Sequence, residues 1–152
     1  MVRSIAKTAR ILSGITRKLV TRPGEAWLLL RMAWWVAVLC VTARLYSLPR
    51  ALQLVAGNNG KQRAQASTNE EELARAIDLL LSVDFLIFTP ICWKRAAVLH
   101  RYLSHSGIPT RIIFGVRNEI DGKVAGHAWL EHDGRPFLES APPEYVVTYS
   151  FP

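Results

Sequence analysis

The stretch TPICWKRAAVLHRYLSHSGIPTRIIFGVR, residues 89–117, contains the change of hydrophobic period that decides the fold. Its proline at position 90 suits the first turn of a helix. Gly107, followed two residues later by Pro109, is typical of a helix end. Beyond this break the apolar residues follow a period of two, which indicates a strand. A helix with Cys92 in its first turn therefore leads directly into a sheet.

The segments before and after residues 89–117 continue this order of helices followed by strands. Downstream, residues 124–132 and 135–140 are predicted to form two further strands, and residues 118–123 a turn. Upstream, Thr68 and Glu71 form a capping box that opens a helix to about residue 82. Helices followed by an antiparallel meander predict an α+β fold, in which the helix bearing Cys92 packs on the sheet.

Residues 1–55 are predicted to form a basic, apolar region of helices. Residues 4–20 form a basic amphipathic helix, and a longer helix starts after Arg22-Pro23-Gly24 and runs to about residue 48, where Pro49 ends it. The longer helix is apolar on all sides over much of its length and approaches the length of a membrane span. Packing on the core or a partner, interfacial membrane contact and a true span all remain open. Residues 56–67 are polar and Gly/Asn-rich and indicate a linker, so residues 68–152 form a second unit.

The formal net charge of +7 is concentrated in the N-terminal region. Residues 1–50 carry nine Lys or Arg and one acid, Glu25, which gives +8; residues 51–152 carry ten basic and eleven acidic residues, which gives −1. This distribution favours an acidic partner or an anionic membrane surface near residues 1–50. A nucleic-acid partner is disfavoured, because the sequence has no zinc-finger spacing, RNP-like aromatic motif or dense Lys/Arg arm.

Cysteine usage and the N-terminus indicate a reducing compartment. The two cysteines, Cys40 and Cys92, cannot form a disulfide framework and lack metal-ligand spacing with histidine, so we predict no metal site. The basic start has no short apolar run with a small-residue cleavage site, which disfavours a signal peptide. We therefore expect a cytoplasmic protein, with peripheral membrane contact through residues 1–50 as the alternative.

Cys92 itself has two interpretations. It shares a helix face with Ala96, Leu99 and Leu103, so it is either a small apolar residue packed in the core or a nucleophile. The first turn of a helix offers backbone N–H groups and the positive end of the helix dipole, and both favour a thiolate. The helix alone leaves both interpretations open.

A nucleophilic cysteine needs a base, and His127 is the best placed of the four histidines. It lies mid-strand in AGHAWLEHDG between small residues, although a histidine in a strand is also common as a structural residue. His100 and His105 follow Cys92 along its own helix and are expected to face solvent, and His132 borders a turn.

The register of the hairpin decides which residue faces His127. A two-residue Asp-Gly loop would place Ser140 opposite His127 and turn Glu139 to the other face. We predict instead a three-residue loop over residues 132–134, because it collects complementary pairs on one face. Those pairs are Glu131 with Arg135, Trp129 with Phe137 and His127 with Glu139. The triplet Cys92, His127 and Glu139 would then match a nucleophile, base and orienter.

At these residues the chain resembles a known family. CWKRAAVLHRYLSHSGIPTRIIFGV (92–116), followed by GHAWLEHDGRPFL (126–138), is similar to the transglutaminase-like peptidase of lasso-peptide biosynthesis. This bacterial enzyme removes the leader from a precursor peptide before a separate synthetase closes the lactam ring. The resemblance covers about residues 68–140. It implies a papain- or transglutaminase-like catalytic core within residues 68–152, preceded by N-terminal helices.

The resemblance also implies roles and partners. Cys92 would be the nucleophile and His127 the base and then the acid, without a cofactor. The family usually has an aspartate twelve residues after the histidine, where this chain has Glu139. The implied partners are the precursor peptide, a separate small leader-recognition protein and an ATP-dependent lactam-forming cyclase. We expect the backbone N–H groups of Cys92 and Trp93 to stabilise the oxyanion. A cross-linking acyltransferase and a non-catalytic scaffold for precursor and cyclase are the alternatives.

Overall fold

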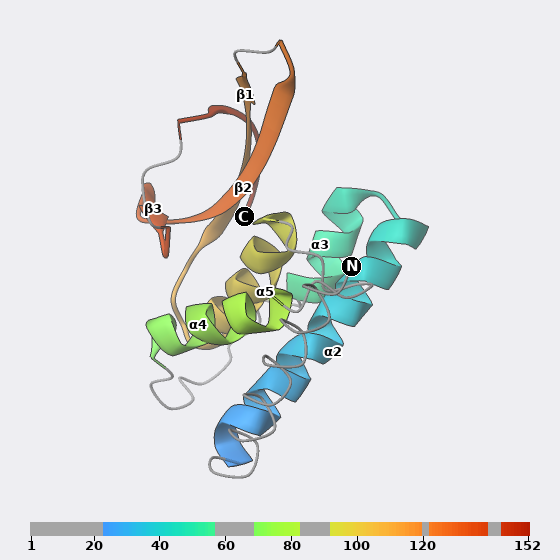
Figure 1. The fold of residues 1–152 in the computed structure, drawn as a ribbon, viewed down its shortest axis with the longest axis vertical. Coiled ribbons are helices and arrows are strands. Elements are labelled where there is room, and N and C mark those ends of the chain that lie inside the picture. Colours follow the sequence, from blue (N-terminus) through green and yellow to red (C-terminus); the bar gives the residue numbers. More distant parts are fainter. Residues whose placement is uncertain (1–22, 57–68, 83–91, 120–121, 140–143) are drawn as a thin grey trace, which may run out of the picture.

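The computed structural model describes residues 23–56, 69–82, 92–119, 122–139 and 144–152. The described helices are α2 (Pro23–Leu45), α3 (Leu48–Ala56), α4 (Glu70–Leu81) and α5 (Cys92–His105). The described strands are β1 (Arg111–Asn118), β2 (Val124–His132), β3 (Arg135–Phe137) and β4 (Val146–Phe151) (Figure 1). The helix predicted at 4–20, nearly all of the linker predicted at 56–67, and the helix start predicted at Pro90 lie outside the described residues.

The four strands form one antiparallel sheet in the order β3-β2-β1-β4. Described helices followed by this sheet confirm the predicted α+β fold. The strand at 124–132 was predicted with the bounds that β2 has, whereas β4 was not predicted. β4 pairs with β1 along one edge of the sheet, and only its last residue, Phe151, is buried. Five successive exposed residues leave β4 without a buried face that a hydrophobic pattern in the sequence could indicate.

Helix α5 lies at the centre of the molecule, between the sheet and the other helices (Figure 1). It contacts α2, α3, α4, β1 and β2, and the predicted inward face of Ala96, Leu99 and Leu103 is buried. One apolar cluster joins all of these elements, and it includes Met32, Val36, Leu39, Leu52, Val55, Leu73, Ile77, Leu99, Leu103, Ile112, Leu130 and Phe151. Burying each large side chain of this kind contributes about 1.5–3 kcal/mol. The core therefore fixes where α5, and with it Cys92, begins relative to the sheet.

Helix α2 has the length and apolar composition of a membrane-spanning segment over Gly24–Leu45. The core helix of a soluble protein satisfies the same criteria. In this fold one face of α2 is packed, because Met32, Val36 and Leu39 are fully buried against the rest of the core.

Two predicted helix boundaries are corrected. The long helix ends at Leu45 instead of near residue 48, and Pro49 lies in the first turn of a separate helix, α3. Proline fits there because a first-turn N–H needs no partner within the helix. Helix α4 is capped by Asn69, whose side chain accepts a hydrogen bond from the Glu71 N–H at 3.1 Å, rather than by Thr68. Asparagine is at least as good an N-cap as threonine, so the competing cap was present in the sequence.

The predicted end of the Cys92 helix is confirmed. Gly107 has a φ of 82°, and the Ile108 N–H donates to the Leu103 carbonyl at 2.9 Å. This is the hydrogen bond of a glycine C-cap, which turns the chain from α5 into β1.

His100 does not face solvent, contrary to the sequence prediction. It is fully buried on α5, its Nδ1 lies 2.9 Å from Thr110 Oγ1, and its ring meets Phe151 edge-on. Burial lowers the pKa of His100 to about 4, although the contact with Thr110 partly opposes this shift. Its Nε2 has no hydrogen-bond partner among the described residues, so a proton added there would have no acceptor.

We therefore expect His100 to make the fold less stable in acid. The unfolded chain takes up this proton near pH 6.5 and the folded chain only near pH 4, so unfolding becomes easier as the pH falls through this interval. Between pH 7 and pH 4.5 the free energy of unfolding should drop by about 2 kcal/mol through this residue. Urea denaturation of the wild type and of His100→Asn at both pH values tests this. An identical pH dependence in the two proteins would contradict it.

Candidate active site

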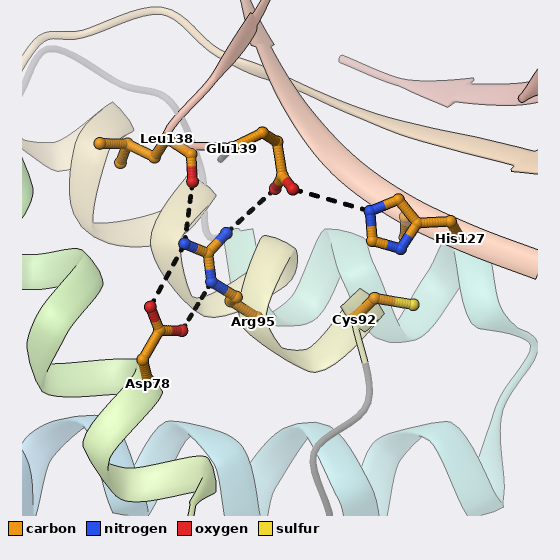
Figure 2. Close-up of a pocket in the computed structure, with 7 residues that line it drawn as sticks. Asp78, Cys92, Arg95, His127, Leu138 and Glu139 are labelled. Atoms are coloured by element: carbon orange, nitrogen blue, oxygen red, sulfur yellow. Dashed lines mark hydrogen bonds and ion pairs between the residues drawn. The ribbon is translucent and has the colours of Figure 1, made fainter. Parts of the chain in front are cut away.

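Cys92, His127 and Glu139 line one pocket, which has a volume of about 360 Å³ (Figure 2). The three residues come from the start of α5, the middle of β2 and the chain just after β3. The remaining lining residues are Asp78, Arg95, Ala128 and Leu138. The fold thus brings the three side chains singled out in the sequence to one place.

Cys92 is the first residue of α5 and is partly exposed. Its backbone N–H and that of Trp93 belong to the first helical turn, where N–H groups have no acceptor within the helix. The Trp93 side chain packs against the apolar core, which anchors this turn. The thiol therefore lies at the positive end of the α5 dipole, next to backbone donors that can bind an oxyanion.

His127 lies on β2 directly opposite Gly115 on β1. Two aromatic rings flank its imidazole, those of Trp129 at 6.0 Å and Tyr145 at 5.2 Å between centroids. In Figure 2 the ring nitrogen that does not face Glu139 lies on the side of the ring towards Cys92. The imidazole thus has a carboxylate on one side and shares its pocket with the thiol, and aromatic packing sets its position.

Gly115 provides the space for this aromatic packing. A Cβ atom at position 115 would lie 2.8 Å from the Tyr145 Cβ and 3.0 Å from the Trp129 ring. Real Cβ atoms do not approach other atoms so closely. The absence of a side chain here lets both rings reach the strand pair that carries His127.

Glu139 Oε2 lies 3.7 Å from His127 Nε2. This separation is within ion-pair distance and is longer than a hydrogen bond. Contacts between catalytic groups are often long before substrate binds. The carboxylate is thus placed to hold the imidazole and to stabilise it once it carries a proton.

The predicted hairpin register is wrong, although the predicted His127–Glu139 pair forms. His132 pairs with Arg135 and Leu130 with Phe137, so the loop is the two-residue Asp-Gly turn and Trp129 does not face Phe137. Asp133 and Gly134 have φ values of 50° and 72°, as a type I′ turn requires. The turn chemistry of Asp-Gly therefore outweighed the complementary pairs that the longer loop would have formed.

Glu139 reaches His127 because the third strand stops early. β3 ends at Phe137, instead of reaching residue 140 as predicted, and Leu138 adopts a φ of 57°. A left-handed residue redirects the chain out of the sheet, so face alternation no longer applies to the next side chain. Glu139 enters the pocket from this bend rather than from a strand.

Arg95, which no sequence pattern singled out, contacts the carboxylate of Glu139. Its Nη1 donates to Glu139 Oε1 at 3.0 Å, and its Nη2 donates to the Leu138 carbonyl at 2.9 Å. Its Nε donates to Asp78 Oδ1 at 2.7 Å (Figure 2). The only sequence signal was position: Arg95 lies three residues after Cys92 and therefore on a neighbouring part of the same helix face.

No group of three or more His, Cys, Asp or Glu side chains that could hold a metal ion is found within the described ranges. The chemistry that the pocket offers comes from a thiol, an imidazole, a paired carboxylate and helix-start amides. These groups are the components of nucleophilic acyl transfer.

Comparison with known proteins agrees with this geometry. The family model of the transglutaminase-like superfamily matches residues 35–150, which run from α2 to β4 and contain every pocket residue. No curated protein and no solved structure matches the chain.

Proposed function

Because the chain belongs to the transglutaminase-like superfamily, which includes cysteine peptidases and acyltransferases, we propose that it is a cytoplasmic cysteine peptidase that removes the leader from a lasso-precursor peptide. The observation that carries the proposal is the pocket in which Cys92, His127 and Glu139 meet. The choice of peptidase and of precursor rests on the resemblance of residues 92–116 and 126–138.

In the first half of the proposed reaction Cys92 is acylated. His127 takes the proton of the Cys92 thiol, and the resulting thiolate attacks the carbonyl carbon of the scissile peptide bond. The negative oxygen is held by the backbone N–H groups of Cys92 and Trp93. The C–N bond then breaks, and His127 gives its proton to the leaving nitrogen. The core peptide departs with a new N-terminal amine, and the leader remains as a thioester on Cys92.

In the second half water releases the leader. His127, now neutral, takes a proton from a water molecule that attacks the thioester carbonyl. The C–S bond breaks, and the Cys92 thiolate takes back the proton from His127. The leader leaves as a carboxylic acid, which loses its proton to solvent. Glu139 faces the imidazole throughout and stabilises it in the steps in which it is positively charged.

Mass spectrometry of a precursor peptide incubated with the protein and its recognition partner tests this function. A peptidase gives the leader with a free carboxylate and the core with a free amine. The same incubation with an added primary amine separates the alternative, because an acyltransferase would attach that amine to the leader instead of water. An intact precursor under all conditions would contradict catalysis and leave the scaffold role.

We propose that the leader-recognition protein binds the exposed face of α2. This face carries five large apolar side chains spaced three, four or seven residues apart: Trp27, Leu30, Trp34, Val41 and Leu45. Both indoles are about two-thirds exposed, at 64% and 66%, and exposed apolar stripes of this kind mark interaction sites. Arg31 and Arg44 are exposed on the same helix, so the complementary partner surface is apolar with acidic residues at its rim.

Trp34→Glu should weaken binding of the recognition protein at least roughly tenfold, because it places a charge in the centre of the stripe. Isothermal titration calorimetry measures the change. Val124→Glu is the matched control, since Val124 is similarly exposed at 64% but lies at the start of β2. Unchanged partner binding by Trp34→Glu, with loss of co-sedimentation with anionic vesicles, would instead assign the stripe to a membrane surface.

A further inference from the structure

Arg95 connects three separate parts of the chain at the edge of the pocket. It lies on α5 and contacts Asp78 on α4 and both residues of the bend after β3, Leu138 and Glu139. We propose that Arg95 is a positioning residue, which holds Glu139 in the orientation that serves His127. This inference rests on the proposed catalytic roles of Cys92 and His127.

Glu139 needs such a restraint, because it is not held by the sheet. It follows the left-handed Leu138 and lies beyond the last paired residue of β3. A glutamate also has one more rotatable bond than an aspartate, and fixing each such side chain costs conformational entropy. Without a second contact the carboxylate would sample several positions relative to the imidazole.

The two carboxylate oxygens of Glu139 face different partners. Oε1 accepts from Arg95 at 3.0 Å, and this leaves Oε2 facing His127 Nε2 at 3.7 Å. Arg95 Nη2 at the same time fixes the adjacent backbone through the Leu138 carbonyl. Side chain and backbone of the bend are thus restrained by one guanidinium.

The guanidinium is itself held by Asp78. Asp78 Oδ1 accepts from Nε at 2.7 Å and Oδ2 from Nη2 at 3.4 Å. All three guanidinium nitrogens are therefore engaged, in a planar arrangement that a lysine ammonium cannot reproduce. The position of α4 is in this way coupled to the orientation of Glu139.

The ion pair between Arg95 and Glu139 matters because both side chains are largely buried. The side chains of Arg95 and Glu139 are only 22% and 17% exposed, whereas that of Asp78 is 53% exposed. A carboxylate withdrawn from water without a partner is strongly unfavourable. Arg95 compensates the charge of Glu139, the more buried of the two carboxylates, and Asp78 is the outer, more hydrated end of the chain of contacts.

A double-mutant cycle on the reactivity of Cys92 tests the proposal. We would measure the rate of iodoacetamide alkylation at neutral pH for Arg95→Gln, Glu139→Gln and the double variant, all in a Cys40→Ala background. Each single variant should be alkylated roughly tenfold more slowly, and the double variant no more slowly than either. Effects that multiply in the double variant, or an unchanged rate for Arg95→Gln, would overturn the proposal.

Two further variants separate positioning from stability and from charge. Arg75→Gln removes an exposed arginine that pairs with Glu71 at 2.6 Å, and its alkylation rate should equal that of the wild type. Arg95→Lys keeps the charge but loses the planar fork, so its rate should remain below wild type. A wild-type rate for Arg95→Lys, or a rate that falls only in variants with a lowered melting temperature, would contradict a positioning role.

The alkylation measurement requires no peptide. Failure of the cycle would therefore leave leader cleavage by Cys92 and His127 untouched. Conversely, absence of precursor cleavage together with a coupled cycle would overturn the proposed substrate and keep the role of Arg95.

Discussion

Replacing Cys92 by alanine is expected to abolish leader removal while leaving the protein folded. The rate should fall on the order of 10⁴- to 10⁶-fold, because no other group in the pocket can form the thioester. The thiol lies partly exposed at the helix start and outside the apolar core cluster, so its loss should change the melting temperature little. Mass spectrometry of the precursor, with thermal unfolding alongside, measures both quantities.

The second cysteine provides the matched control. Cys40 lies on α2, away from the pocket, and Cys40→Ala should retain both cleavage and rapid alkylation of the remaining thiol. If Cys92→Ala still cleaved the precursor, the thioester mechanism would be wrong. Slow alkylation of Cys92 in the wild type would support the interpretation of this residue as a packed core cysteine.

Gly115→Ala is expected to disturb the site from the opposite strand. The new methyl group would lie 2.8 Å from the Tyr145 Cβ and 3.0 Å from the Trp129 ring, so one of the two aromatic residues flanking His127 must move. Such overpacking typically costs about 1–3 kcal/mol of stability. Displacement of the imidazole by about 1 Å should also reduce the cleavage rate, by roughly a hundredfold.

Gly126→Ala is the matched control for this substitution. Gly126 immediately precedes His127 on β2, yet a Cβ built there meets no atom of the described residues within 4 Å, apart from its own chain neighbours. Denaturant unfolding and cleavage assays should therefore find Gly126→Ala close to wild type. If both glycine variants behaved alike, the aromatic packing over Gly115 would not be what positions His127.

The sequence predicted the parts of the fold that depend on local chemistry. Gly107 specifies the end of α5, and the turn residues on either side of Val124–His132 specify the bounds of β2, without reference to the rest of the chain. Cys92 and His127, which line one pocket, were singled out as candidates because few residue types can provide a nucleophile and a base. His100 was misplaced, although it lies close to Ala96 and Leu103 around the helix and is buried with them.

The features of the site that the sequence did not predict depend on contacts between segments far apart in the chain. Arg95 and Asp78 are separated by 17 positions, and Arg95 and Glu139 by 44, so no local spacing relates them. The pairing of His127 with Glu139 was predicted through a register that the Asp-Gly turn does not adopt. The left-handed conformation of Leu138, a residue type that rarely adopts it, is what restores the contact.

The two faces of α2 are under different constraints, because one packs in the core and the other lies on the surface. Met32, Val36 and Leu39 are enclosed by the rest of the fold, whereas Trp27 and Trp34 lie on the surface. A shortened chain without this helix would lose part of its core, so the proposed recognition surface cannot be removed or exchanged as a separable module. A change of partner must instead arise by substituting the outer residues one at a time while the inner ones stay constant. Relatives that serve different precursors should therefore differ mainly at the outer positions of this helix, which recur every three or four residues, and should keep the inner positions apolar.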